Sequence, residues 1–190
     1  MRVNIYLLVT LSLLSACQFL EESVSGNGNL ISEQRSVGTF SAIHTSGGIE
    51  VRYKHASTHS VVVDTDENLL PYINVSSDGE TLSIRQKNNS SLNPTDGIVV
   101  FVTAPNINLI HLSGASHFYS ESPIAGNSLD IELSGASGVD IKVEQNDLTI
   151  DMSGASSATL AGVATTLKID GSGSSQINAY NLAVKECELD

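Results

Sequence analysis

One five-residue phrase returns four times in the second half of this chain. It reads LSGAS at residues 112–116 and again at 133–137, MSGAS at 152–156 and GSGSS at 171–175. The central glycines of these phrases are 21, 19 and 19 residues apart. A near-constant period of this length, with short strand-like runs on both sides, is typical of stacked repeats. The sequence therefore predicts an all-β fold, a single-stranded β-solenoid (β-helix) with coils of about 19–21 residues.

Apolar residues alternate with polar ones ahead of each phrase, which is the period of a β-strand. The alternating positions are Leu129, Ile131 and Leu133 in one repeat, Leu148, Ile150 and Met152 in the next, and Leu167 and Ile169 in the third. Such strands can stack in parallel about 4.8 Å apart. Because Gly permits tight corners and Ser can hydrogen-bond local amides, we interpret SGAS as a corner, with Ser ladders outside and an Ala column inside.

The sequence between residues 37 and 105 is less regular. Asp78-Gly79, between the apolar pairs Ile73/Val75 and Leu82/Ile84, predicts a hairpin. Residues 106–190 hold the SGAS repeats, and the pattern stops in the middle of a repeat at Cys187–Asp190, so we expect the array to be incomplete at its C-terminal end. Cys187 falls where Leu129, Leu148 and Leu167 fall in the earlier repeats, so we predict a buried thiol.

The N-terminus carries the pattern of a processing signal. Arg2 precedes an apolar run that is too short to span a membrane, and Leu14-Ser15-Ala16-Cys17 resembles the bacterial lipobox. We therefore predict a lipoprotein signal peptide at residues 1–16 and lipidation of Cys17; the alternative is an ordinary secretory signal with a chance cysteine. Residues 17–36 are polar and glycine-rich, which predicts a flexible tether.

These features predict an extracytoplasmic protein that is lipid-anchored to the bacterial cell envelope. Gln18 is not the Asp that signals inner-membrane retention in some bacteria, which favours the outer membrane or cell surface. The formal net charge is −12, so the chain repels phosphate backbones and a nucleic-acid partner is excluded.

One set of side chains repeats with the phrase. Two residues before each corner serine lie His111, Glu132, Asp151 and Asp170, with Asp190 in the same register. Stacked carboxylates repel one another, and calcium bridging their oxygens would relieve that repulsion. Glu132, Asp151 and Asp170 are therefore a possible cation-binding column. The alternative is a solvated acidic stripe that discourages lateral strand pairing.

Catalytic patterns are absent from the sequence. The repeats contain no Arg, their only basic side chains are Lys142, Lys168 and Lys185, and the five His show no zinc spacing. We predict that the chain is not an enzyme and has no catalytic residues. The alternative is a calcium-assisted polysaccharide-active protein, since pectate-lyase-type enzymes share the broad architecture.

The chain also resembles a known family, the putative auto-transporter adhesin, head GIN domain family. The resemblance rests on the lipobox and on FSAI (40–43), IEVRY (49–53), DENLLPYINV (66–75), DGETLSI (78–84) and the tandem LSGAS repeats. It implies a right-handed, single-chain β-solenoid in a secreted or surface lipoprotein, and it transfers no catalytic residue. We expect a non-enzymatic adhesion, binding or structural module with a protein or glycan partner, possible homo-oligomers, and no cofactor other than the possible calcium.

Overall fold

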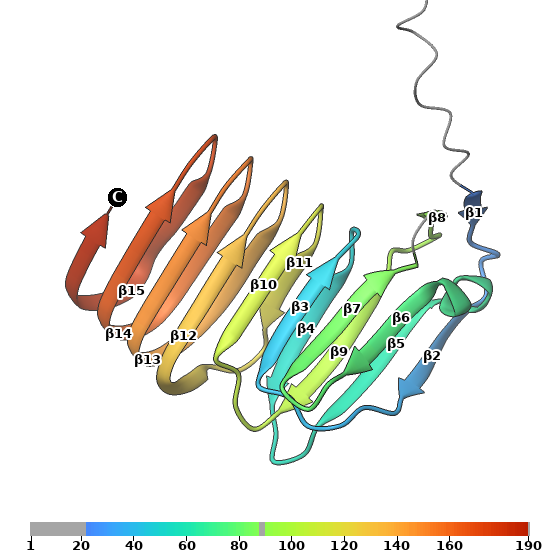
Figure 1. Cartoon of the computed structure of the whole chain (residues 1–190), viewed down its shortest axis with the longest axis horizontal. Helices are drawn as coiled ribbons and strands as arrows, with labels where there is room; N and C mark the ends of the chain where they lie inside the picture. Colours follow the sequence, from blue (N-terminus) through green and yellow to red (C-terminus); the bar gives the residue numbers. More distant parts are fainter. Residues whose placement is uncertain (1–21, 88–89, 190) are drawn as a thin grey trace, which may run out of the picture.

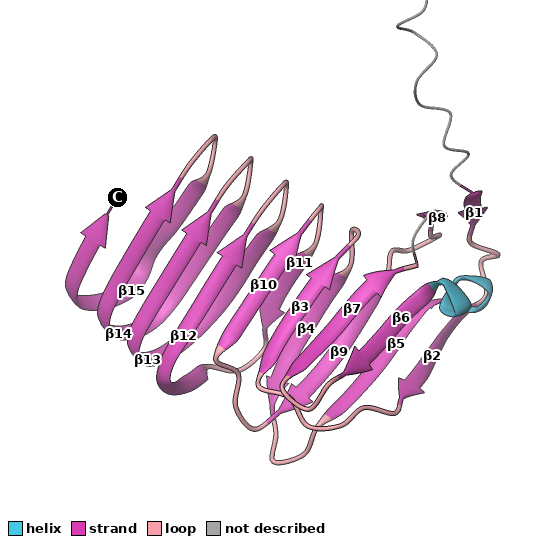
Figure 2. Cartoon of the chain, in the orientation of Figure 1, coloured by secondary structure: helices cyan, strands magenta, loops and turns pink. Residues whose placement is uncertain are grey.

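The computed structural model describes residues 22–87 and 90–189, and strands account for most of them (Figures 1 and 2). The strands are β1 (Glu22–Ser25), β2 (Leu30–Arg35), β3 (Ala42–Ser46), β4 (Glu50–His55), β5 (Ser60–Asp66), β6 (Ile73–Ser77), β7 (Thr81–Gln86), β8 (Ser90–Asn93), β9 (Val99–Ala104), β10 (Leu109–Ser113), β11 (His117–Ser120), β12 (Ile124–Leu133), β13 (Gly138–Met152), β14 (Ser157–Gly171) and β15 (Gln176–Leu189). A short 3-10 helix, η2 (Glu67–Tyr72), follows β5. The all-β class is therefore confirmed.

The predicted β-solenoid architecture is wrong. Within the described residues, eleven strands follow one another in a single sheet in the order β2-β5-β9-β4-β11-β13-β12-β10-β3-β7-β6, and β14 and β15 extend it from β13. The pairs β2–β5, β5–β9 and β6–β7 are antiparallel, whereas the others on this path are parallel. The sheet is thus mixed, and it folds back on itself as a nearly closed, barrel-like path instead of a series of uniform right-handed coils.

The reason for the error lies in what the repeat can specify. A spacing of 19 residues dictates how neighbouring repeats pair, and this register is observed: Leu129 lies opposite Leu148, and Leu148 opposite Leu167. It carries no information on the pairing of residues before the first repeat. There the hairpin of β6 and β7, which Asp78-Gly79 predicted, and the antiparallel strands β2 and β5 decide how the sheet ends.

The core lies between the strands that Figure 1 shows in front and those behind them. Strand β13 belongs to both groups, because its first residues pair with β11 and its later residues pair with β12. The alternating leucines, isoleucines and valines point inward, and the largest fully buried side chains include Tyr53 and Phe118. The outward positions of the same strands are mostly polar, so the two groups of strands present separate outer faces.

The predicted tether is wrong from Glu22 onward, since this segment forms β1 and β2. Strand β2 pairs with β5 along its whole length. The Gly28 amide donates a hydrogen bond to Asp66 Oδ1 at 2.7 Å, and a Cβ at Gly26 would collide with the same carboxylate. The glycines therefore serve a close contact with buried Asp66 and not flexibility. The signal peptide and Cys17 lie outside the described residues.

Cys187 is exposed, contrary to the prediction. Its register is the expected one, opposite Leu167. In the described structure, however, β15 has β14 as its one strand neighbour, so nothing packs over its other side. Tyr180, on the same strand, lies at an irregularity in the pairing with β14 and is 97% exposed.

Candidate functional site

The polar side chains that lie two residues before the first serine of each SGAS phrase form a continuous row. Parallel pairing places His111 of β10 opposite Glu132 of β12, Glu132 opposite Asp151 of β13, and Asp151 opposite Asp170 of β14. We call these four residues the acidic row. All three carboxylates are exposed, and His111 is half-buried. The predicted register is confirmed as far as Asp170, while Asp190 lies beyond the described residues.

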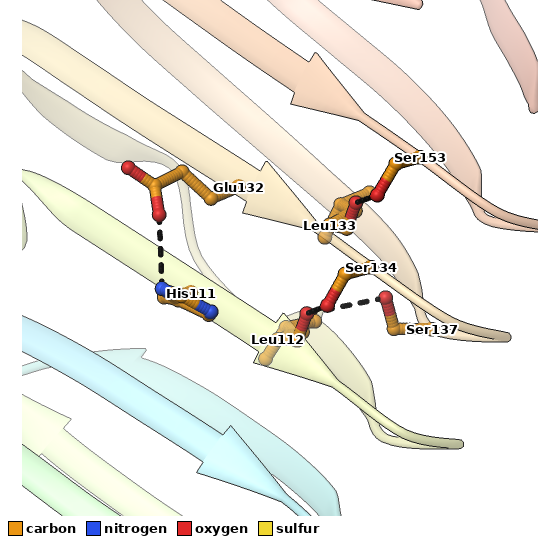
Figure 3. Close-up of polar contacts among 7 residues, drawn as sticks. All are labelled: His111, Leu112, Glu132, Leu133, Ser134, Ser137 and Ser153. Carbon is orange, nitrogen blue, oxygen red and sulfur yellow. Dashed lines mark hydrogen bonds and ion pairs between the residues drawn. The ribbon is translucent and has the colours of Figure 1, made fainter. Parts of the chain in front are cut away.

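The acidic row lines one side of an open groove of about 450 Å³ next to the SGAS turns. The remaining lining residues come from the strand ends and from the first serine of each turn: Leu133, Met152, Ser134, Ser153 and Ser172. Each of these serine hydroxyls donates to the carbonyl of the neighbouring repeat, as from Ser134 Oγ to Leu112 O at 3.4 Å (Figure 3). Their oxygens keep acceptor capacity, so the groove presents acceptors at every repeat.

At the β10 end, the acidic row is joined by imidazoles. His111 Nδ1 lies 2.9 Å from Glu132 Oε2, and Figure 3 shows the two side chains reaching toward each other across adjacent strands. On its other side, His111 stacks on His44 of β3, with ring centroids 4.2 Å apart. Desolvation, followed by the charge of His111, lowers the pKa of His44 below 6.5.

His44 is a residue of this site that sequence reasoning missed. The signal was present, because Ile43-His44-Thr45-Ser46-Gly47 repeats the pattern Ile110-His111-Leu112-Ser113-Gly114. The two segments are 67 residues apart, far from the 19-residue period, yet β3 and β10 pair in parallel with His44 opposite His111. A search for the phrase without a fixed period would have found it.

The acidic row does not form a metal site by its geometry. Among the residues that the structure describes, no three His, Cys, Asp or Glu side chains converge on a point that could hold a metal ion. Adjacent strands are about 4.8 Å apart, so the row distributes its carboxylates along a line. The carboxylates of Glu132, Asp151 and Asp170 therefore do not converge on a common point where they could bind one calcium ion.

The turns themselves differ from the prediction of outer serines and inner alanines. In the first three phrases the second serine, Ser116, Ser137 or Ser156, is 1% exposed, and the alanine before it is exposed. The second serine is the first inward position of the next strand, as the alternation Ser137, Val139, Ile141 shows. A small side chain fits there, and Ser137 Oγ lies 3.4 Å from Leu112 O, to which it donates a hydrogen bond.

The described part of the chain contains no helix with both the length and the apolar character needed to cross a membrane.

Comparison with solved structures supports the fold. A crystal structure of a putative adhesin from Bacteroides fragilis has a TM-score of 0.82 at 21% identity, over 87% of this chain and 78% of that one. A putative lipid binding protein from Parabacteroides distasonis has a TM-score of 0.69 at 18% identity, over 88% and 80%. A putative adhesin from Parabacteroides merdae has a TM-score of 0.64 at 24% identity, with the same coverage. At these identities the likeness concerns the fold alone.

Among curated proteins, none is significantly similar in sequence. Residues 39–190, however, match one protein family over most of the chain's length. The match includes both the irregular strands and the SGAS repeats, and it confirms the resemblance drawn from the sequence. The chain belongs to the family described as putative auto-transporter adhesin, head GIN domain.

Proposed function

We propose that this protein is a non-enzymatic binding module of the bacterial envelope, anchored through a lipid on Cys17, that contacts a cationic partner through the groove of the acidic row. The adhesin description of its family supports a binding role. The lipobox-like residues before Cys17 support the anchor. The observation that carries the choice of partner is the unbroken line of carboxylates along an open groove.

The groove favours positively charged, extended partners for a physical reason. Glu132, Asp151 and Asp170 project at regular strand intervals, and the groove lining includes no Lys or Arg. The formal net charge of −12 adds a general attraction for cations. An extended lysine- or arginine-rich segment of a neighbouring protein can place several cationic groups along this line at once. The groove lining contains no Arg or Lys of the kind that removes the proton in pectate-lyase-type cleavage, so the polysaccharide-active alternative is not favoured here.

The binding proposal is tested with a fluorescent lysine-rich peptide and the variant Glu132→Gln/Asp151→Asn/Asp170→Asn. Exposed ion pairs contribute about 0.2–1 kcal/mol each, so we expect the affinity to fall about 10-fold at low salt. The charge-matched control is Asp140→Asn/Glu144→Gln/Asp147→Asn, whose three exposed residues lie on β13 outside the groove. If the two variants lost the same affinity for the peptide, the binding would depend on overall charge and not on the groove. Failure of the wild type to bind the peptide would refute a cationic partner.

The anchor is tested separately by detergent phase partitioning of the protein expressed in a bacterium that processes lipoproteins. We expect the wild type and a Cys187→Ser control in the detergent phase, and Cys17→Ser in the aqueous phase. Recovery of the wild type in the aqueous phase would refute lipid anchoring while leaving the groove proposal untouched.

A further inference from the structure

A second groove lies on the other outer face, on strands that take no part in the acidic row. It is an open depression of about 450 Å³ over β2, β5, β9 and β4. We call it the aromatic groove, and its lining residues are Leu30, Ile31, Ser32, Arg52, Asp64, Thr65, Asp96, Gly97, Val99 and Phe101. Register alone explains the grouping, because Asp64 lies opposite Val99, and Phe101 lies opposite both Val62 and Arg52.

The apolar part of the aromatic groove is exposed where a sheet of this kind has polar residues. Phe101 is 38% exposed in the middle of β9, which has strand partners on both sides, and Leu30 on β2 is 46% exposed. Val99 is half-buried beside them. Single exposed apolar residues are common, but a ring, a leucine and a valine lining one depression form an apolar patch of the kind found at binding sites.

The polar part of the aromatic groove has unused hydrogen-bonding capacity. Within residues 22–87 and 90–189, the carboxylates of Asp64 and Asp96 have no hydrogen-bond donor, although Asp64 is half-buried. The Arg52 guanidinium is held by Glu50, with Nε 2.6 Å from Oε1, and this hydrogen bond raises the pKa of Arg52. The groove therefore offers carboxylate acceptors and an oriented guanidinium donor around an exposed ring.

We propose that the aromatic groove binds a neutral oligosaccharide. A sugar ring has an apolar C–H face that packs on an aromatic ring, and hydroxyls at its edge that donate to carboxylates and accept from a guanidinium. The two carboxylates of the lining outnumber its one guanidinium, which Glu50 already pairs, so an anionic sugar is not complementary. The exposed ring and the hydroxyl-binding groups instead favour a neutral sugar. This site is independent of the cationic partner proposed for the acidic row.

A second aromatic surface indicates that the ligand is longer than one sugar. Tyr119 of β11 lies opposite Arg52, which itself lies opposite Phe101, so the backbones of Tyr119 and Phe101 are two strand spacings apart, about 9.6 Å. Tyr119 stacks on His117 with ring centroids 4.4 Å apart, which restricts its orientation. A ligand that contacts both rings across Arg52 must contain at least two sugar units.

The test is affinity electrophoresis of the full chain through gels containing soluble neutral polysaccharides: hydroxyethylcellulose, mixed-linkage β-glucan, galactomannan or dextran. We expect at least one of them to retard the wild type, and Phe101→Ala and the isosteric Asp64→Asn each to weaken that binding about 10-fold. The control is Tyr180→Ala, which removes an exposed aromatic ring outside the groove and should bind as the wild type does. Thermal melts would establish that each variant is folded.

Three results would overturn the proposal. One is that none of the four polysaccharides retards the wild type. Another is retardation that Phe101→Ala and Asp64→Asn leave unchanged. The third is loss of binding to a hydrophobic peptide on Phe101→Ala without any binding to sugars, which would make the aromatic groove a peptide site. None of these results bears on the lysine-rich peptide assay, so the two proposals succeed or fail separately.

Discussion

The glycine of the SGAS turn gives the sharpest test of how the repeats stack. Gly154 has φ of 77°, and a Cβ on this residue would lie 2.6 Å from the carbonyl oxygen of Gly135 in the preceding turn. That oxygen accepts a hydrogen bond from the Ala155 amide at 2.8 Å. Gly154→Ala would therefore strain its own backbone, crowd the neighbouring turn and weaken the hydrogen bond between the two turns.

The magnitude follows from these three effects. The positive φ costs an alanine about 1–2 kcal/mol, crowding of a packed region about 1–3 kcal/mol, and a weakened hydrogen bond about 1 kcal/mol. We expect Gly154→Ala to lower the free energy of unfolding by about 3–6 kcal/mol. Gly79 has φ of 99°, but a Cβ there would have no atom within 4 Å, so Gly79→Ala should lose only the backbone contribution, about 1–2 kcal/mol.

Chemical denaturation followed by circular dichroism measures both variants against the wild type. The difference between them isolates the contact between turns, because both glycines have positive φ and only Gly154 touches a neighbouring turn. If Gly154→Ala lost no more than Gly79→Ala, the turns would not be in close contact. The explanation of the repeated glycine as a requirement of stacking would then be refuted.

Three further predictions concern single side chains. Desolvation keeps the pKa of His44 below 6.5, so the unfolded state binds more protons than the folded state as the pH falls, and the free energy of unfolding should fall from about pH 7.5 to about pH 5.5. Thermal melts of His44→Gln should show a smaller fall over the same pH range. A fall equal to that of the wild type would contradict this prediction. Hydrogen bonds from Thr95 and Gly28 lower the pKa of Asp66 below 3.8, so its contribution to the free energy of unfolding is present above that pH and is lost as the pH falls toward the lowered pKa. Asp66→Asn should therefore be less stable than the wild type near neutral pH and should lose less stability between about pH 6 and about pH 3. An equal loss of stability in the variant and the wild type would contradict this prediction. Exposed Cys187 should react with a maleimide in native Cys17→Ser protein as completely as after denaturation, and protection until unfolding would contradict its exposure.

Sequence reasoning located the acidic row because its information is local. Each member lies two residues before a turn, and side-chain alternation along a strand sends that position outward whenever Leu133, Met152 or their equivalents point inward. The same reasoning placed the serines wrongly. After the turn, the alternation of inward and outward side chains begins again at Ser137. The backbone conformation at the glycine decides whether this first side chain points inward or outward.

The aromatic groove could not have been predicted in this way. Leu30, Asp64, Arg52 and Phe101 come from four strands between residues 30 and 104, and no repeat relates them. They meet because β5 pairs antiparallel with both β2 and β9, while β9 pairs in parallel with β4. Such pairings depend on long-range contacts whose combined energy a local pattern does not reveal.

By itself, the sequence determined the β class, the family, the register of neighbouring repeats and the outward line of Glu132, Asp151 and Asp170, because all of these follow from a period of two within strands and a near-constant period between them. Only the tertiary structure decided that the sheet is mixed and nearly closed, that β2 (Leu30–Arg35) belongs to it, and that His44 stacks on His111. The physical reason is that strand pairing between distant segments is chosen by the burial and hydrogen bonding of the whole sheet, which no single stretch of the chain contains.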